Sequence, residues 1–495
     1  MKNTLIALLL LPIVCTFNLK AQPYFQKLIY PGFGYYEEAH RTYNGIIICG
    51  TDANDSVGLI KTDSIGNVAW SYKYLPNCYY PTVVELPDSG FIVATVPLNL
   101  FRVSKTGAII WCRSFNIQEA GPVKLIRIPG NKFLVTGTCQ STPNGNPFLL
   151  KFDISGNVLW SKLYPFSPFL SSLPYDIIPT RDSAFLISGL AADTSHSAYW
   201  ERGLFIKVDS LGNVLWAKKI IGSVYSDEYR VTNCIELPSG AFLAYGADES
   251  SYNNYLVKID ASGTILFAKH ISSGYAPVKM IQQASNRFEF STLNELGCMD
   301  SLGNISYMET YGDTFPKNFS DIEPINSSSL LCGHIEHIIW NKPGTYLVKI
   351  DSTGDAGCHQ APLSPSSNTF TVNTVNFSIP NTSLNLFSSF VTVLPVAGRD
   401  TTYDLCMFNG IPDLKRELLS AFLYPNPCSN VLHIESSHDI LSYTLFDIAG
   451  RDLSGLQHSV DEKRIDVSEL QEGLYFLKLN FNCGTRILKF LKTAF

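Results

Sequence analysis

The sequence predicts an all-β protein, a seven-bladed β-propeller followed by a small Ig-like β-sandwich. Three observations predict this fold class. A ten-residue pattern with a central glycine recurs seven times, and its glycines are 40 to 56 residues apart. Such a period is typical of solenoids, propellers and other repeat architectures. The chain has 25 Tyr and 30 Phe but only 5 Met, which favours strands over helical bundles. The last 75 residues or so alternate short apolar segments with turns.

The N-terminus predicts export. Lys2 precedes an apolar run over residues 5–14, and Ala21 ends a plausible cleavage site, so residues 1–21 are expected to be a signal peptide. A lipoprotein signal would need small residues before Cys15, and Pro-Ile-Val stands there instead. No later apolar run reaches the roughly 18 residues that span a bilayer. We therefore expect no membrane-spanning segment after the signal is removed.

Composition excludes several partner classes. A 495-residue chain with 45% hydrophobic residues can form two or three domains. Its net charge of −6 is spread along the chain without a basic stripe, so we expect neither nucleic acid nor anionic membrane as a partner. The sequence contains neither a G-x-S-x-G nucleophile motif nor a P-loop. These absences favour a non-catalytic protein over an enzyme, and the question of catalysis stays open.

The repeat itself predicts a β-hairpin. Its seven copies are "KTDSIGNVAW" (61–70), "RVSKTGAIIW" (102–111), "KFDISGNVLW" (151–160), "KVDSLGNVLW" (207–216), "KIDASGTILF" (258–267), "CMDSLGNISY" (298–307) and "KIDSTGDAGC" (349–358). In the fourth copy, Asp209 can accept a backbone N–H bond and Gly212 supplies a positive φ for the turn. Simple alternation puts Val208 and Trp216 on one face of the hairpin and Lys207 on the other. Because both faces are apolar, the hairpin should lie between two neighbouring blades.

We assign the repeated residues to the scaffold, because one active site rarely needs several equivalent copies. These residues are Asp63, Gly66, Trp70, Gly107, Trp111, Asp153, Gly156, Trp160, Asp209, Gly212, Trp216, Asp260, Gly263 and Phe267. A second strand-turn-strand element precedes each hairpin, as in "ELPDSGFIVAT" (85–95). The two elements together predict a four-stranded blade, and the seven blades span residues 22–357. Trp160 and Trp216 should be largely buried between blades.

This repeat resembles that of exported bacterial β-propeller proteins of unassigned function, over residues 25–357. It is more distantly similar to the tryptophan-docking repeat of pyrroloquinoline-quinone propellers, and that resemblance implies that the indoles of Trp70, Trp111, Trp160 and Trp216 lock neighbouring blades together. The quinone enzymes usually have eight blades and a vicinal disulfide. This chain has seven repeats and no Cys-Cys pair, so no cofactor is expected.

Residues 421–495 resemble the type A C-terminal sorting domain of the type IX secretion system of Bacteroidetes. The matching residues are Tyr424, Pro425, Asn426, Pro427, Asp447, Gly450, Arg451, Gly473, Leu474, Tyr475, Lys489 and Lys492. The resemblance implies binding to the secretion machinery, passage through the periplasm, and release or surface attachment of the protein. Residues 358–420 should connect the two parts, as extra strands or a small module ending near Leu405, followed by a linker.

The cysteines fall into two groups, small buried residues and candidate disulfide partners. Without Cys15, 11 cysteines remain in an oxidising compartment. Cys49, Cys139 and Cys332 lie in strand-like contexts and should be small buried residues, because no CxxC pair or histidine cluster that could bind a metal accompanies them. Cys358 with Cys406, and Cys428 with Cys483, are candidate disulfides.

Other candidate chemistry is sparse. His334 and His337 stand in "HIEH", but three residues apart in a strand they point to opposite faces. Glu37 with Glu38, and Asp227 with Glu228, could act as acid and base, although exposed acidic loop residues are the simpler interpretation.

Two functional hypotheses remain. The first is a secreted or cell-surface propeller that binds a glycan, protein or peptide without catalysis. The second is an extracellular hydrolase or lyase acting on polysaccharide, which depends on analogy with the fold and export route alone. Charged residues clustered near the ring centre would favour the enzyme.

Overall fold

The computed structural model has two compact units, Met1–Met407 and Phe408–Phe495. The described residues are 24–30, 35–52, 54–117, 121–139, 145–165, 172–193, 200–222, 228–273, 276–284, 286–311, 317–325, 328–339, 342–364, 366–379, 382–384, 386, 388–398, 400–405, 421–436, 439–448, 450–453, 459–461, 463–481 and 484–493. The expected signal peptide lies outside them.

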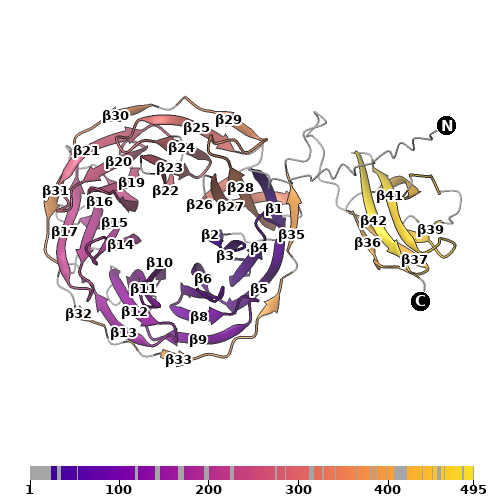
Figure 1. The fold of residues 1–495 in the computed structure, drawn as a ribbon, viewed down its shortest axis with the longest axis horizontal. Helices are drawn as coiled ribbons and strands as arrows, with labels where there is room; N and C mark the ends of the chain where they lie inside the picture. Colours follow the sequence, from indigo (N-terminus) through magenta and orange to yellow (C-terminus); the bar gives the residue numbers. More distant parts are fainter. Residues whose placement is uncertain are drawn as a thin grey trace, which may run out of the picture. The chain divides into compact units, whose positions relative to one another are not determined.

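The first unit is a closed ring of seven β-sheets, and this confirms the predicted propeller (Figure 1). Each blade begins with its innermost strand and continues outward as an antiparallel meander. Blade 1 is β2 (Tyr35–Thr42), β3 (Gly45–Thr51), β4 (Ser56–Thr62) and β5 (Val68–Pro76). Blade 2 is β6 (Tyr79–Glu85), β7 (Phe91–Val96), β8 (Asn99–Val103) and β9 (Ile109–Phe115). Blade 3 is β10 (Gly121–Ile128), β11 (Lys132–Cys139), β12 (Asn146–Asp153) and β13 (Val158–Leu163).

The remaining blades repeat this order until the ring closes. Blade 4 is β14 (Ser172–Pro179), β15 (Phe185–Asp193), β16 (Trp200–Val208) and β17 (Val214–Ile221). Blade 5 is β18 (Tyr229–Glu236), β19 (Phe242–Asp248), β20 (Asn253–Ile259) and β21 (Ile265–Ile271). Blade 6 is β22 (Pro277–Ala284), β23 (Arg287–Thr292), β24 (Glu295–Met299) and β25 (Ile305–Tyr311). Blade 7 combines β26 (Lys317–Ile325), β27 (Ser328–Ile339) and β28 (Lys342–Ile350) with the N-terminal strand β1 (Phe25–Tyr30).

Every blade has a fifth strand that the repeat did not predict. One segment, residues 360–405, supplies all seven and is called the belt here. Its strands are β29 (Gln360–Pro362) on blade 6, β30 (Ser367–Thr369) on blade 5, β31 (Asn373–Asn376) on blade 4, β32 (Thr382–Ser383) on blade 3, β33 (Ser388–Phe390) on blade 2, β34 (Val396–Ala397) on blade 1 and β35 (Thr401–Asp404) on blade 7. Figure 1 shows the belt in orange around the outside of the ring, running against the order of the blades.

The belt follows the ring with a period of seven residues. In each blade, one belt N–H donates to the backbone carbonyl of the residue that follows the outer-strand aromatic residue. The seven pairs are Leu363 to Met308, Phe370 to Ala268, Phe377 to Ala217, Leu384 to Ser161, Val391 to Cys112, Gly398 to Ser71 and Leu405 to Gln26. The N···O distances are 2.8–3.3 Å. Seven residues of belt therefore span one blade.

Apolar belt side chains extend the cores between blades. Leu384 and Leu386 pack against the cluster between blades 2 and 3, and Ile379 is buried in the cluster between blades 3 and 4. The Phe370 ring stacks on His270 with centroids 3.7 Å apart. These contacts give the belt a hydrophobic attachment in addition to its hydrogen bonds.

The repeated hairpin turn has the expected backbone and an unexpected register. Gly212 has a φ of 80°, and its N–H donates to the Asp209 carbonyl at 3.0 Å. A β-bulge follows the turn, so Lys207 lies opposite Trp216 and Val208 opposite Val214, with Leu215 unpaired. Simple alternation was therefore wrong for Lys207, which shares the face of Trp216, because the bulge adds one residue to the outer strand.

The second unit is formed by two sheets. One contains β36 (Ala421–Tyr424), β37 (Val431–Ser436), β40 (Arg464–Asp466) and β39 (Ser459–Asp461), and the other contains β38 (Ile440–Asp447), β41 (Gly473–Phe481) and β42 (Gly484–Lys492). A single apolar cluster joins them, with Leu432 and Ile465 from the first sheet and Leu445 and Leu477 from the second. The unit is therefore a small sandwich.

The turn glycines give a prediction with an internal control. Gly212 and Gly240 have nearly the same positive φ, 80° and 78°, but a Cβ at Gly212 would lie 3.0 Å from the Trp160 ring, whereas nothing lies within 4 Å at Gly240. We expect Gly240→Ala to lower the free energy of unfolding by about 1–2 kcal/mol, through backbone strain alone. Gly212→Ala should lower it by a further ~1–3 kcal/mol, because the indole must move. Urea unfolding of both variants tests this, and equal losses would contradict the packing role.

Candidate functional site

The repeated aromatic residues contact the turn of the next blade. Trp111, Trp160 and Trp216 lie against Gly156, Gly212 and Gly263, where an added Cβ would be 2.9–3.0 Å from the indole. Trp70 Nε1 donates to the Lys105 carbonyl at 3.0 Å, and Trp111 Nε1 donates to the Ile154 carbonyl at 3.2 Å. Trp160 and Trp216 are partly buried, each lying against the turn glycine of the next blade. The indoles belong to the outer strands of their blades.

The closing blade uses an aromatic residue that the repeat did not reveal. Phe25 of β1 lies opposite Lys349, as Trp160 lies opposite Lys151, and its ring is 3.1 Å from the Cβ position of Gly66. No repeat motif surrounds Phe25, because its hairpin partner is more than 300 residues away in the sequence.

Tyrosines add a second contact between blades. Tyr74, Tyr164 and Tyr311 donate their hydroxyl groups to the carbonyls of the next turn glycine, at 2.8, 2.8 and 2.6 Å. Each follows the repeat aromatic by four residues, so a longer alignment window would have found them.

The repeat aspartates stabilise their own turns. Asp209 Oδ1 accepts the N–H groups of Leu211 and Asn213 at 2.9 and 2.8 Å. Burial raises the pKa of Asp209, but hydrogen bonds from Asn213 and Leu211 outweigh it and hold the pKa below its usual value. Asp63, Asp153 and Asp260 make the same pair of backbone contacts. The structure thus distributes these residues among separate blades and does not gather them into one site.

A different set of polar residues does gather, on the seven innermost strands. Each of these strands has a β-bulge, and one polar residue follows it: Glu38, Thr82, Lys124, Asp176, Asn233, Lys279 and Asp321. We call these seven residues the inner girdle. Since a bulge leaves backbone groups without a partner strand, polar side chains are needed at this level.

Five of the seven girdle residues connect their blade to the next through those backbone groups. Asp321 accepts the N–H of Ala39 at 3.0 Å, and Glu38 accepts the N–H of Val83 at 3.2 Å. Thr82, Asp176 and Asn233 make the equivalent contacts to Leu125, Cys234 and Met280. Lysine cannot accept a hydrogen bond, so Lys124 and Lys279 instead donate to carboxylates.

Ion pairs neutralise the charges of four girdle residues, Glu38, Lys124, Lys279 and Asp321. Lys124 Nζ is 2.5 Å from Glu38 Oε1, and Lys279 Nζ is 2.8 Å from both Asp321 and Glu323. His40 lies between two carboxylates, 3.1 Å from Glu38 and 3.3 Å from Glu323. Burial lowers the pKa of His40, but the two carboxylates outweigh it and raise the pKa to about 10. The imidazole is therefore protonated at neutral pH.

This cluster has the donor atoms of a metal site but not its charge balance. Ligand atoms of Glu38, His40 and Asp321 lie within 4.8 Å of one another. Both carboxylates already contact a lysine, and the imidazole carries a proton. A divalent cation would have to displace these positive groups, so the described residues fit a self-neutralised ion-pair network better than a metal centre.

The other sequence candidates lie apart. Glu38 belongs to the girdle, and the side chain of Glu37 is outside the described part of the structure. Glu228 precedes β18, and Asp227 lies outside the described residues. His334 is 3.5 Å from Asn318 in blade 7, and the side chain of His337 is not described.

Cys49, Cys139 and Cys332 are buried and form no disulfide, as expected from their strand contexts. Cys428 is also free and buried, so its predicted disulfide with Cys483 is wrong: its side chain packs in the apolar core of the sandwich. Cys358 is disulfide-bonded, and Cys406, its predicted partner, lies outside the described residues.

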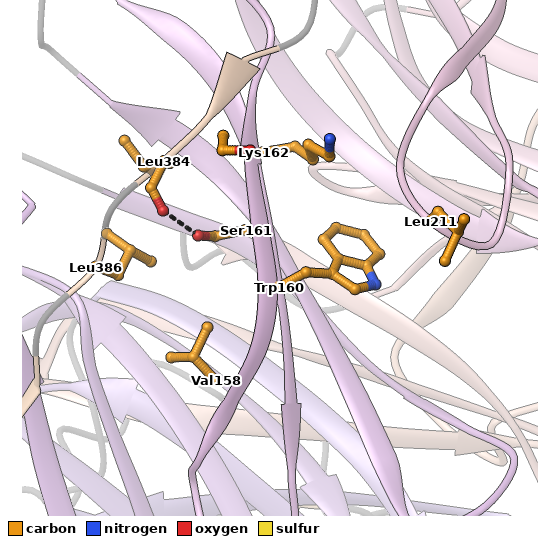
Figure 2. Close-up of a pocket in the computed structure, with 8 residues that line it drawn as sticks. Val158, Trp160, Ser161, Lys162, Leu211, Leu384 and Leu386 are labelled. Carbon is orange, nitrogen blue, oxygen red and sulfur yellow. Dashed lines mark hydrogen bonds between the residues drawn. The ribbon is translucent and has the colours of Figure 1, made fainter.

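A hollow of about 500 Å³ lies at the outer edge of blade 3, and Figure 2 shows the residues that line it. Trp160 and Val158 of β13, Leu211 of the next turn, and Leu384 and Leu386 of the belt line it. The Trp160 N–H has no hydrogen-bond partner among the described residues. Ser161, Lys162 and Ser383 also line it, so the belt and the outer strand leave a depression of mixed polarity at the rim.

In the sandwich, the sorting motif joins the first strand to the last. Asn426 donates to the Lys489 carbonyl at 3.2 Å and accepts the Leu491 N–H at 2.9 Å. Arg451 donates to Asp447 at 2.6 Å across the turn of Gly450, whose φ is 79°. Tyr475, two residues after Gly473, stacks on Phe490 with centroids 5.6 Å apart. Lys492 is buried, and the Tyr424 ring stacks on His433. The peptide bonds that precede Pro425 and Pro427 are cis.

Comparison with known proteins identifies this unit. Residues 422–493 match the family described as "Secretion system C-terminal sorting domain". The chain therefore carries a type IX sorting domain, which takes it through the secretion machinery to the cell surface or the medium. No curated protein matches the sequence. In the described part of the chain, no helix has the length and apolar character to cross a membrane.

Three solved structures are similar to the chain at low identity. A protein of unknown function from Bacteroides caccae is 11% identical, with 57% of this chain and 93% of that chain covered and a TM-score of 0.37. The polysaccharide lyase Uly1 is 8% identical, with 65% of this chain and 90% of that chain covered and a TM-score of 0.43. Sqt1 from Chaetomium thermophilum is 9% identical, with 64% of this chain and 97% of that chain covered and a TM-score of 0.37.

The pKa of His40 predicts a pH dependence of stability. Because its folded pKa of about 10 exceeds the ordinary value of 6.5, its contribution is complete below pH 6.5 and is lost as the pH rises toward 10. His40→Gln should lower the free energy of unfolding at pH 6 and flatten its decline between pH 6.5 and 10. Urea titrations at several pH values measure this. His433→Gln, in the sandwich, should leave the propeller transition unchanged, and an unaltered pH profile in His40→Gln would refute the role.

The sorting domain predicts where a truncated protein stops. Deleting residues 421–495 in a host with a type IX system should leave the protein in the periplasm, because the signal for the outer-membrane step is gone. Cell fractionation and immunoblotting measure the distribution. Secretion of the truncated protein at the normal level would contradict this assignment.

Proposed function

We propose that this protein is a secreted or surface-attached propeller that binds another protein through the outer strands of blades 2 to 5, and that it carries out no catalysis itself. An arc of exposed aliphatic side chains supports the proposal. Ile110, Leu159, Leu215 and Leu266 are 50%, 46%, 54% and 56% exposed. Each is the unpaired bulge residue after its hairpin turn, so the four occupy equivalent positions on consecutive blades.

The arc is restricted to part of the ring. The equivalent residues are Ala69 in blade 1 and Ser306 in blade 6. The fold needs no large apolar side chain at this position, since these two blades form the same bulge with small residues. A partner that spans these four blades would meet the same aliphatic position on each of them. Aliphatic side chains offer no hydrogen bonds to sugar hydroxyls, and therefore the arc suits a protein or peptide better than a glycan.

The setting of the arc also favours binding. Its strands are anchored on one side by the indole contacts and on the other by the belt, which reduces the entropy lost when a partner binds. The hollow beside Trp160 lies on the same strand as Leu159 and could receive a partner side chain (Figure 2).

The alternative function, a polysaccharide hydrolase or lyase, is favoured by the charged girdle near the ring centre. There, however, the carboxylates of Glu38 and Asp321 accept backbone N–H groups and lysine contacts at once. Such groups serve the connection between blades. If the girdle were the active site of such an enzyme, the Glu38→Gln variant would lose turnover of a panel of polysaccharides.

The arc predicts a specific loss of binding. Leu159→Ser combined with Leu215→Ser should reduce capture of surface and secreted proteins of the host at least about tenfold, since burying each leucine contributes roughly 1.5–3 kcal/mol. Quantitative mass spectrometry after crosslinking measures capture. The matched control, Ala69→Ser with Ser306→Ala, should capture the wild-type set. Equal capture by both variants, or turnover of a glycan by the wild type, would overturn the proposal.

A further inference from the structure

The two ends of the belt meet at one buried residue. The Gln26 side chain donates to the carbonyl of Cys358, just before β29, and its own backbone carbonyl accepts the N–H of Leu405, just after β35, at 2.9 Å. His359 Nε2 lies 3.4 Å from the Leu405 carbonyl. Gln26 is fully buried, and the Tyr346 hydroxyl donates to its side chain. The belt thus starts and ends at the same strand after passing all seven blades.

The state of the cysteines identifies what joins these ends. Cys358 is disulfide-bonded, and the eight other described cysteines form no disulfide. Of the 12 cysteines in the sequence, only Cys15, Cys406 and Cys483 remain as partners. Cys406 follows Leu405 directly, and Leu405 is in contact with His359, the neighbour of Cys358. Disulfide geometry requires Cα atoms about 4.4–6.8 Å apart, which neighbours of contacting residues can satisfy.

We infer that a disulfide between Cys358 and Cys406 closes the belt into a covalent loop around the propeller. The Sγ–Sγ bond forms by thiol–disulfide exchange with an oxidised protein disulfide of the periplasm. That oxidant takes up the two electrons and two protons of the two thiols. The loop contains one seven-residue segment for each blade and covers the outer edge of every sheet.

Closure makes the ring harder to open. Without it, blade 7 is completed by hydrogen bonds and packing of β1 alone, and either end of the belt could peel from its edge. With it, a local opening of one blade leaves the belt held at both sides. The loop also lies upstream of residues 421–495, so removal of the sorting domain leaves it intact.

A cleavage experiment on the full-length protein tests this topology. A specific protease site is introduced at Leu394, a belt residue that is 81% exposed. The purified protein is cut, free thiols are alkylated, and the products are separated on denaturing gels with and without reductant. Closure predicts one band without reductant and two bands with it, because the disulfide joins the two fragments. Peptide mapping of the uncut wild type should identify the Cys358–Cys406 crosslink directly.

Two matched variants identify the partner. Cys483→Ser should behave like the wild type, and Cys406→Ser should give two bands without reductant and faster proteolysis of the belt. Two bands from the parent protein without reductant would overturn the inference, as would fragments that stay joined in Cys406→Ser but separate in Cys483→Ser. Should Cys406→Ser fail to fold, the peptide map of the wild type still decides the outcome.

Discussion

At six of the seven junctions between blades, an aromatic ring lies on the turn glycine of the next blade and fixes the two blades together. At the seventh junction, Leu256 and Lys269 lie against Gly303 instead. The glycine is needed for two reasons: its φ is positive, and a side chain would collide with the neighbouring indole, as at Gly212 and Trp160. Where the ring closes, Phe25 of blade 7 makes the same contact with Gly66 of blade 1. Because a ring closes only when every blade meets the next at a similar angle, side-chain packing on these glycines constrains the angle at each junction.

The two edges of each sheet present different problems. On the inner strands, bulges leave backbone N–H groups that the girdle side chains satisfy, as Asp321 does for Ala39. On the outer strands, unpaired edges could pair with other chains, and the belt covers all seven of them. The belt strands are short, with two to four residues each, so the new outer edge is a poor template for further pairing.

The surface is where the blades differ. Turn and packing residues are repeated because each blade must make the same contacts, whereas Ile110, Leu159, Leu215 and Leu266 give way to Ala69 and Ser306 elsewhere in the ring. The proposed binding function depends on this difference. The girdle is also non-repeated, but most of its charges are paired within the network, as Lys124 with Glu38 illustrates.

Local chemistry made the blades and the sorting domain predictable. The turn of Asp209 and Gly212 is complete within a few residues, and the motif from Tyr424 to Pro427 is contiguous, so the sequence alone determined the number of blades and the export route. The girdle could not be found this way, because its residues come one from each of seven strands and meet only when the ring closes. The face of Lys207 depended on a bulge, and the place of Phe25 on a pairing across the whole ring. The belt shows a seven-residue period in the sequence, but only the tertiary structure could assign it, because each of its segments pairs with a strand that is distant in the chain.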